Sequence, residues 1–226
     1  QLAALRDPSF RAQAVESMRG STGDILGGMA TLKHVFPLNG RGVRAYETDP
    51  ERSIVALSER TGKPVAEIII DHLLETQGKG FFLVPLFNPD LDAAGAMLAH
   101  PLTGIGLGDS GAHTSQTCDA SYSTFLLAYW VRERKLFGIE RAIRKLIALT
   151  GDGNPTIRKL AFDPALMWGL HDRGLLRHGA YADVNVIDLD RLDITMPELR
   201  HEFPAGAPHL TQGSVGYDAT VVNGKI

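Results

Sequence analysis

Apolar residues recur along this chain at two different spacings, and the change from one to the other divides the chain into regions. Residues 64–74 and 139–149 place apolar side chains at the 3.6-residue period of an amphipathic helix. Residues 182–189 instead alternate apolar and polar side chains, as a half-exposed strand does. The pattern predicts helices that alternate with short strands over most of the chain, and a β-rich region towards its end.

Capping and turn residues predict where these elements begin and end. Asp7-Pro8 and Asp49-Pro50 indicate helix starts, since Asp is a preferred N-cap and Pro suits the first helical turn. Asn223-Gly224 indicates a hairpin turn. The expected helices cover residues 8–18, 50–58, 64–74, 89–99, 117–134, 139–149 and 155–161. The expected strands cover 29–36, 80–86, 103–107, 182–189 and 217–222.

Strands alternate with helices as far as residue 168, which predicts an α/β fold with a parallel sheet or barrel. The continuous apolar run at 80–86 is typical of a buried parallel strand. From Gly169 onward the sequence is rich in turns and resembles a small β element. We therefore predict two regions, residues 1–168 and 169–226.

The composition of the chain excludes several classes of protein. The 226 residues are 44% apolar and carry a net charge of −3, which excludes a disordered tail. No apolar run approaches the roughly 18 residues of a membrane span, and the slightly acidic balance argues against a nucleic-acid partner. The lone Cys118 is compatible with a reducing compartment, so we expect a cytoplasmic location.

The strongest local candidate for chemistry is the loop Gly106–His113 (GLGDSGAH). Asp109 follows a predicted strand, and α/β folds place their active sites at the carboxyl ends of strands. The alternative is an Asx-turn, in which Asp109 binds its own backbone, and this is the commoner role of Asp at a tight bend.

The histidines show no metal-binding spacing. The eight form no H-x-H pair and no H-E-x-x-H motif. We expect His72 to be a packed core residue, and only His113 shares the loop of Asp109. The histidines of the turn-rich region are expected to be solvated: His171, His178, His201 and His209.

Other local patterns are weak. Gly106-x-Gly108-x-x-Gly111 matches a dinucleotide fingerprint but lacks an acidic residue after a second strand. Ser110 lacks a nucleophile elbow, and Cys118 fits a spectator role. We interpret Arg132 and its basic neighbours as a solvated helix end.

Several motifs together resemble one family. They are Gly106–His113, Trp130–Arg134 (WVRER), Glu140–Arg144 (ERAIR), Gly169–Gly179 (GLHDRGLLRHG), Tyr181–Val184 (YADV) and Val221–Gly224 (VVNG). In these motifs the chain resembles the C-terminal part of the amidohydrolase superfamily, in the branch of N-acyl-D-amino-acid deacylases (D-aminoacylases). Residues 57–62 and 81–100 fit the same branch.

The resemblance implies a metal-dependent (β/α)₈ TIM barrel with a small β-sandwich. It implies that Asp109 matches the last metal ligand, binds zinc and acts as general base on the zinc-bound water. His113, four residues further on, is a candidate contact for the substrate, an N-acyl amino acid. The other zinc ligands of the family, including an H-x-H pair after the first barrel strand, have no counterpart in this chain.

A barrel of this kind needs about 250 residues, so we expect a fragment truncated at both ends that is inactive and zinc-free alone. Unpaired sheet edges of a partial barrel predict self-association. Two alternatives remain open: a non-catalytic protein that keeps the architecture for assembly or ligand binding, and a hydrolase of cyclic amides.

Overall fold

The computed structural model describes residues 2–19, 24–25, 30–106, 108, 110, 114–115, 119–147 and 161–226. The chain forms two compact units, Gln1–Ala93 and Ala94–Ile226, and the division falls in the first turn of helix α5 (Leu91–Ala99). The division predicted at residue 168 separates the barrel part from the β-sandwich part of the resembled family. It stays a prediction.

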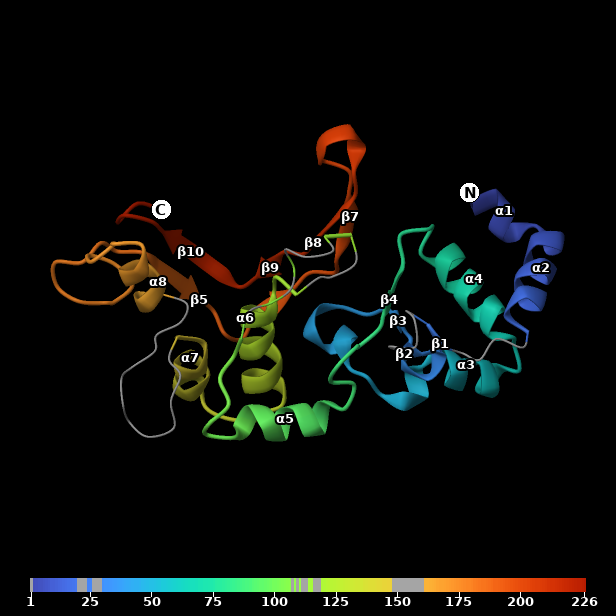
Figure 1. Ribbon diagram of the computed structural model, residues 1–226, viewed down its shortest axis with the longest axis horizontal. Coiled ribbons are helices and arrows are strands. Elements are labelled where there is room, and N and C mark those ends of the chain that lie inside the picture. Colours follow the sequence, from blue (N-terminus) through green and yellow to red (C-terminus); the bar gives the residue numbers. More distant parts are fainter. Residues whose placement is uncertain are drawn as a thin grey trace. The chain divides into compact units, whose positions relative to one another are not determined.

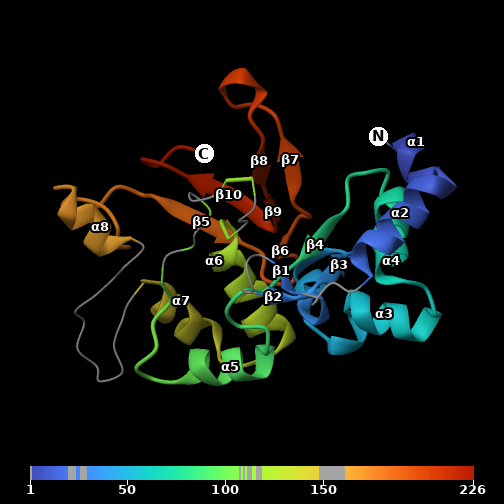
Figure 2. The ribbon, with the colours of Figure 1, turned by 45° about the vertical axis from the view of Figure 1, so that its right-hand side comes forward.

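The first unit is mainly helical, and its helices α2 and α4 lie side by side (Figures 1 and 2). Its helices are α1 (Leu2–Arg6), α2 (Pro8–Met18), α3 (Ile54–Thr61) and α4 (Val65–Glu75), and its 3₁₀ turns are η2 (Leu32–His34), η3 (Gly42–Tyr46) and η4 (Pro50–Arg52). Its strands are β1 (Asp24–Ile25), β2 (Ala30–Thr31), β3 (Phe36–Leu38) and β4 (Phe81–Leu83). Its core includes Phe36, Val43, Ile54, Ala66 and Ile70.

Local capping explains where these helices start. The Asp7 carboxylate accepts hydrogen bonds from the backbone of Ser9 (2.7 Å) and Phe10, which confirms the predicted start of α2. The prediction for residues 50–58 was wrong in detail. Asp49 begins only the single turn η4, and α3 starts after Ser53, whose hydroxyl accepts from Ala56 N at 3.1 Å.

The expectation of a buried parallel strand at 80–86 was wrong. The strand there is β4, and it is short, half-buried and antiparallel to β3. Pro85 follows closely and has no N–H to donate to a ladder, so the apolar run cannot continue as a paired strand. The described part of the predicted strand 103–107 is not in a strand either.

The second unit combines helices with antiparallel hairpins (Figure 1). Besides α5 it contains helices α6 (Tyr122–Phe125), η5 (Leu126–Glu133, a π-helix), α7 (Ile139–Ile147) and α8 (Phe162–Met167), and the 3₁₀ turn η6 (Pro204–Gly206). Its strands are β5 (Val184–Ile187), β6 (Asp193–Ile194), β7 (Glu198–Arg200), β8 (His209–Thr211), β9 (Ser214–Val215) and β10 (Tyr217–Val221).

The core of the second unit is centred on η5. Six consecutive residues, Leu126–Val131, are buried, so this segment is covered on all sides. Gly95 of α5 permits close contact with the Trp130 ring, since a Cβ on Gly95 would lie 3.0 Å from it. The predicted helix at 117–134 therefore exists from Tyr122, but its longer part is π-helical. Residues 117–118, 148–149 and 155–160 of the predicted helices lie outside the described residues.

The chain makes a tight turn at Asn223-Gly224, which confirms the hairpin turn predicted there. Strand β10 leads into this turn. β10 pairs antiparallel with β5, and the two strands lie side by side in Figure 1. Asn223 and Gly224 both have positive φ, +53° and +75°, and Val222 pairs with Lys225 across the turn. The described chain thus mixes helices and strands, all its strand pairs are antiparallel, and it contains no closed barrel. None of its helices is long and apolar enough to cross a membrane.

Candidate functional site

The candidate residues Asp109 and His113 lie outside the described residues, as does Cys118. Gly108 and Ser110, on either side of Asp109, are described, as are Thr114 after His113 and Asp119 after Cys118, and all four belong to the second unit. The geometry of the site is therefore that of its flanks: the segment 100–106, Gly108, Ser110, Thr114 and the start of α6.

A buried ammonium group anchors the segment that leads into this loop. Lys145 on α7 is only 8% exposed, and its Nζ donates to the carbonyl oxygens of His100 (3.0 Å) and Thr103 (2.7 Å). Burial lowers the pKa of Lys145, and the nearby Arg141 guanidinium lowers it further. Arg141 also donates to the carbonyl of Ala99. The last carbonyls of α5 and the turn after it thus receive hydrogen bonds from two cations of α7.

Two further contacts hold the loop near the candidate residues. A Cβ on Gly108 would lie 2.8 Å from the carbonyl oxygen of Asp119 and 3.1 Å from the Tyr122 ring, so this close approach requires glycine. On the other side, Leu210 of β8 donates its backbone N–H to the Thr114 carbonyl at 2.7 Å. The described flanks of the loop are therefore hydrogen-bonded to α7 and to β8, and Gly108 lies close to the start of α6.

Among the described residues, no group of three or more His, Cys, Asp or Glu side chains could hold a metal ion. His72 is buried, with Nε2 3.0 Å from the Phe81 carbonyl and its ring against Phe82, which confirms its core role. His209 was expected to be solvated, and that was wrong. It stacks on Phe203 with ring centroids 4.4 Å apart, and its side chain is 14% exposed.

Arg132 is also not the solvated helix end that the sequence predicted. Its side chain is 19% exposed and donates to the backbone carbonyls of Leu189 (3.2 Å), Asp190 and Leu192. Thr124 and Tyr217 share a hydrogen bond of 2.8 Å through their hydroxyls. The helices before the predicted boundary at residue 168 are thus bonded directly to the strands after it.

Three of the motifs that carry the family resemblance meet in space. The Asp183 carboxylate accepts from the Arg173 guanidinium (3.0 Å) and from the backbone N–H of Asn223 (2.8 Å). Arg173 also lies over the Tyr181 ring, 4.9 Å from its centroid. These contacts join the turn-rich segment to the C-terminal turn. We therefore interpret the three motifs as structural.

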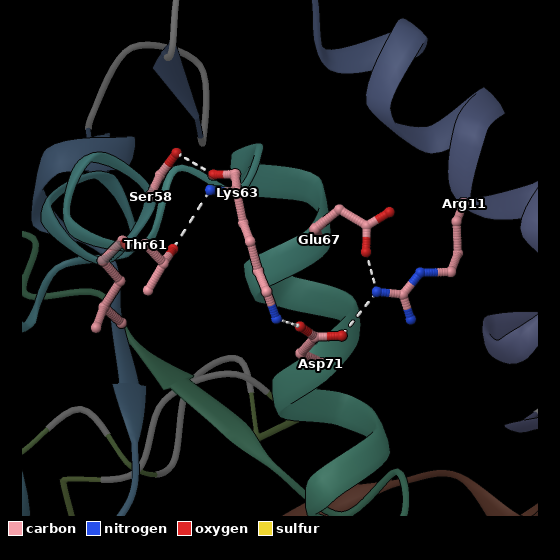
Figure 3. Close-up of polar contacts among 7 residues, drawn as sticks. Arg11, Ser58, Thr61, Lys63, Glu67 and Asp71 are labelled. Atoms are coloured by element: carbon pink, nitrogen blue, oxygen red, sulfur yellow. Dashed lines mark hydrogen bonds and ion pairs between the residues drawn. The ribbon is translucent and has the colours of Figure 1, made fainter.

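The first unit contains a charged network that the sequence analysis missed (Figure 3). Arg11 of α2 binds both Glu67 and Asp71 of α4, and Lys63 binds Asp71 at 2.6 Å. The hydrogen bond from Lys63 is the main cause of the lowered pKa of Asp71. The four-residue spacing of Lys63, Glu67 and Asp71 is a signal that could have revealed it. We interpret the network as a link between helices, because its acids are all paired with cations.

Comparison with known proteins agrees with the resemblance found in the motifs. The chain is 29% identical over 136 residues to N-acyl-D-aspartate deacylase of Alcaligenes xylosoxydans xylosoxydans, a match that covers 58% of this chain. The match covers 24% of that protein's length. A continuous stretch of 58% of 226 residues includes the middle of the chain wherever it starts, so Gly106–His113 lies in the matched region. No family model and no solved structure matches the chain.

Proposed function

We propose that this chain is part of a metal-dependent amidohydrolase, with a TIM barrel in the whole protein, that deacylates N-acyl-D-amino acids. The observation that carries the proposal is the similarity to a deacylase across a region that includes the Asp109 loop. The hydrogen bonds of the loop's flanks to α7 and β8, with the close approach of Gly108 to Asp119, support it, because a catalytic carboxylate needs a fixed backbone on both sides.

The reaction is hydrolysis of a linear amide: water adds to the acyl carbon, the C–N bond breaks, and a carboxylic acid and a free amine result. In this proposal the Asp109 carboxylate accepts a proton from the attacking water and returns it to the leaving nitrogen. A bound zinc ion would supply an activated water with a pKa near 7. In this chain Asp109 is the residue that would hold it.

The substrate proposal starts from the relative's name, which specifies N-acyl-D-aspartate. In this chain the nearest candidate for recognition is His113, whose imidazole can donate a hydrogen bond to a substrate carboxylate. A D-amino acid with an acidic side chain is therefore the first substrate to assay.

The test uses the protein in its full genomic length and compares Asp109→Asn with the matched control Asp190→Asn. Asp190 is exposed and far along the sequence from the loop. We expect Asp109→Asn to lower kcat for N-acetyl-D-aspartate by about 10²–10⁴-fold, the usual contribution of a general base, and to reduce the bound zinc measured by atomic absorption. The control should change neither.

Three results would overturn the proposal. If Asp109→Asn keeps kcat within threefold of wild type, Asp109 is an Asx-turn residue. If the wild-type protein hydrolyses none of a panel of N-acetyl-D-amino acids, N-acetyl-L-aspartate and a cyclic imide, the non-catalytic alternative holds. Turnover of the cyclic imide alone would identify a cyclic amidohydrolase.

A further inference from the structure

Lys145 is an unusual residue for a core position. It lies on the face of α7 that also buries Ala142 and Leu146, where an apolar side chain would complete the packing. Burying an ammonium group costs free energy unless hydrogen bonds replace its water. Among the described residues the acceptors of Nζ are two backbone carbonyls, His100 and Thr103, rather than a carboxylate.

These acceptors show what the buried charge does. The two carbonyls belong to residues three apart, so one ammonium group binds both ends of the turn between α5 and the candidate loop. The backbone N–H of Thr103 closes the same turn by donating to the His100 carbonyl at 3.2 Å, and Lys145 adds a second donor there. His100 Nδ1 accepts from Leu102 N at 3.2 Å inside the same turn. An apolar residue at 145 would fill the space but would leave both carbonyls without this donor.

We propose that Lys145 is a positioning residue for the loop that carries Asp109, acting through the backbone carbonyls of His100 and Thr103. This inference rests on the proposed function. Lys145 binds the turn in which the chain leaves α5, and further along the chain Gly108 lies close to Asp119 and Thr114 accepts a hydrogen bond from Leu210. Its role is geometric, and it takes no part in proton transfer.

The experiment compares Lys145→Met and Lys145→Arg with the control Arg144→Met, which removes an exposed cation from the same helix. Hydrogen–deuterium exchange followed by mass spectrometry reports on the turn without any need for activity. We expect Lys145→Met to speed exchange in peptides covering residues 100–106 by tenfold or more, with exchange in α4 unchanged. Arg144→Met should leave both peptides unchanged.

Kinetics on the full-length protein then test the catalytic consequence. A displacement of about 1 Å in a catalytic group can cost about 10²-fold in rate, so we expect Lys145→Met to lower kcat by about 10- to 100-fold. KM should change less than threefold, because the candidate substrate contact His113 directly precedes Thr114, whose carbonyl accepts from Leu210 N–H without any part played by Lys145. Lys145→Arg keeps the charge and the donors and should recover part of the lost kcat.

The outcomes separate this inference from the proposed function. Unchanged exchange at residues 100–106 in Lys145→Met overturns the anchoring role even in an active enzyme. Faster exchange with wild-type kcat overturns its importance for catalysis. If the wild-type protein is not a deacylase, the proposed function fails and the positioning of a catalytic Asp109 fails with it. The exchange result would then leave Lys145 as a structural anchor.

Discussion

The pKa of Asp71 in the first unit and that of Lys145 in the second are both lowered, yet the two shifts have opposite meanings for stability. Hydrogen bonds from Lys63 and Arg11 lower the pKa of Asp71 because they favour its charged form. Burial lowers the pKa of Lys145 because it disfavours the charged form. The hydrogen bonds to Asp71 thus stabilise its charged form. Burial destabilises the charged form of Lys145, whose ammonium group is bound by two backbone carbonyls.

The difference shows how exposure to water determines what a charged residue contributes to the folded structure. The Asp71 carboxylate is 26% exposed and Lys63 is 55% exposed, so water screens that network. Lys145 is 8% exposed and satisfies carbonyls that would otherwise lack this donor. We therefore expect the network to give modest stability that depends on salt and pH, and the buried lysine to control a local backbone structure.

The largest effect on stability is expected for Lys145→Met. It leaves the Thr103 carbonyl without its Lys145 donor, at a cost of about 1–3 kcal/mol, and removes the opposing cost of burying an ammonium group. The His100 carbonyl also loses Lys145 but keeps the backbone N–H of Thr103 at 3.2 Å. We expect a net loss of about 2 kcal/mol in the second unit, measured by urea unfolding or by exchange at slowly exchanging amides of η5. An unchanged or increased stability would show that the buried charge costs more than its hydrogen bonds contribute.

A smaller and pH-dependent effect is expected for Asp71→Asn. The folded pKa of Asp71 lies below its usual value of 3.8, so its contribution is fully present above about pH 4 and is lost as the pH falls through the folded pKa. We expect the variant to be about 1 kcal/mol less stable than wild type at pH 7, and the gap to narrow below about pH 4.

The measurement is urea unfolding of the first unit followed from pH 7 down to pH 2. A gap that stays constant over this range would mean that the carboxylate charge of Asp71 is not what stabilises the helix pair.

The smallest effect is expected for Lys63→Gln, because its ammonium group is more than half exposed. At low ionic strength the loss should be about 0.5 kcal/mol or less, and 1 M NaCl should abolish it. Lys79→Gln is the control, since Lys79 is an exposed cation outside the network. A loss that persists in 1 M NaCl would show that Lys63 acts through its packing instead.

Part of this fold could be predicted from short stretches of sequence. Asp7-Pro8 identified the start of α2, and Asn223-Gly224 identified the hairpin turn, because capping and positive φ depend on a few neighbouring residues. The helical period around His72 correctly placed that residue in the core. The motifs led to the deacylase resemblance, and the curated relative agrees with it.

Other features depend on contacts between distant residues. The run at 80–86 pairs antiparallel with β3, and nothing in its own apolar content distinguishes that partner from a parallel one. Arg132 and His209 looked solvated by residue type, but they contact a carbonyl cluster and the Phe203 ring that come from other segments. The candidate residues Asp109 and His113 stay predictions, supported by the geometry of their flanks.

The sequence by itself determined the start of α2, the turn at Asn223-Gly224 and the family that its motifs resemble, because each depends on residues close together in the chain. Only the tertiary structure revealed that Lys145 holds the turn before the Asp109 loop and that Asp183 joins Arg173 to Asn223. The physical reason is that a polar side chain acquires its role from the partner it meets after folding. Those partners lie 42, 10 and 40 residues away along the chain.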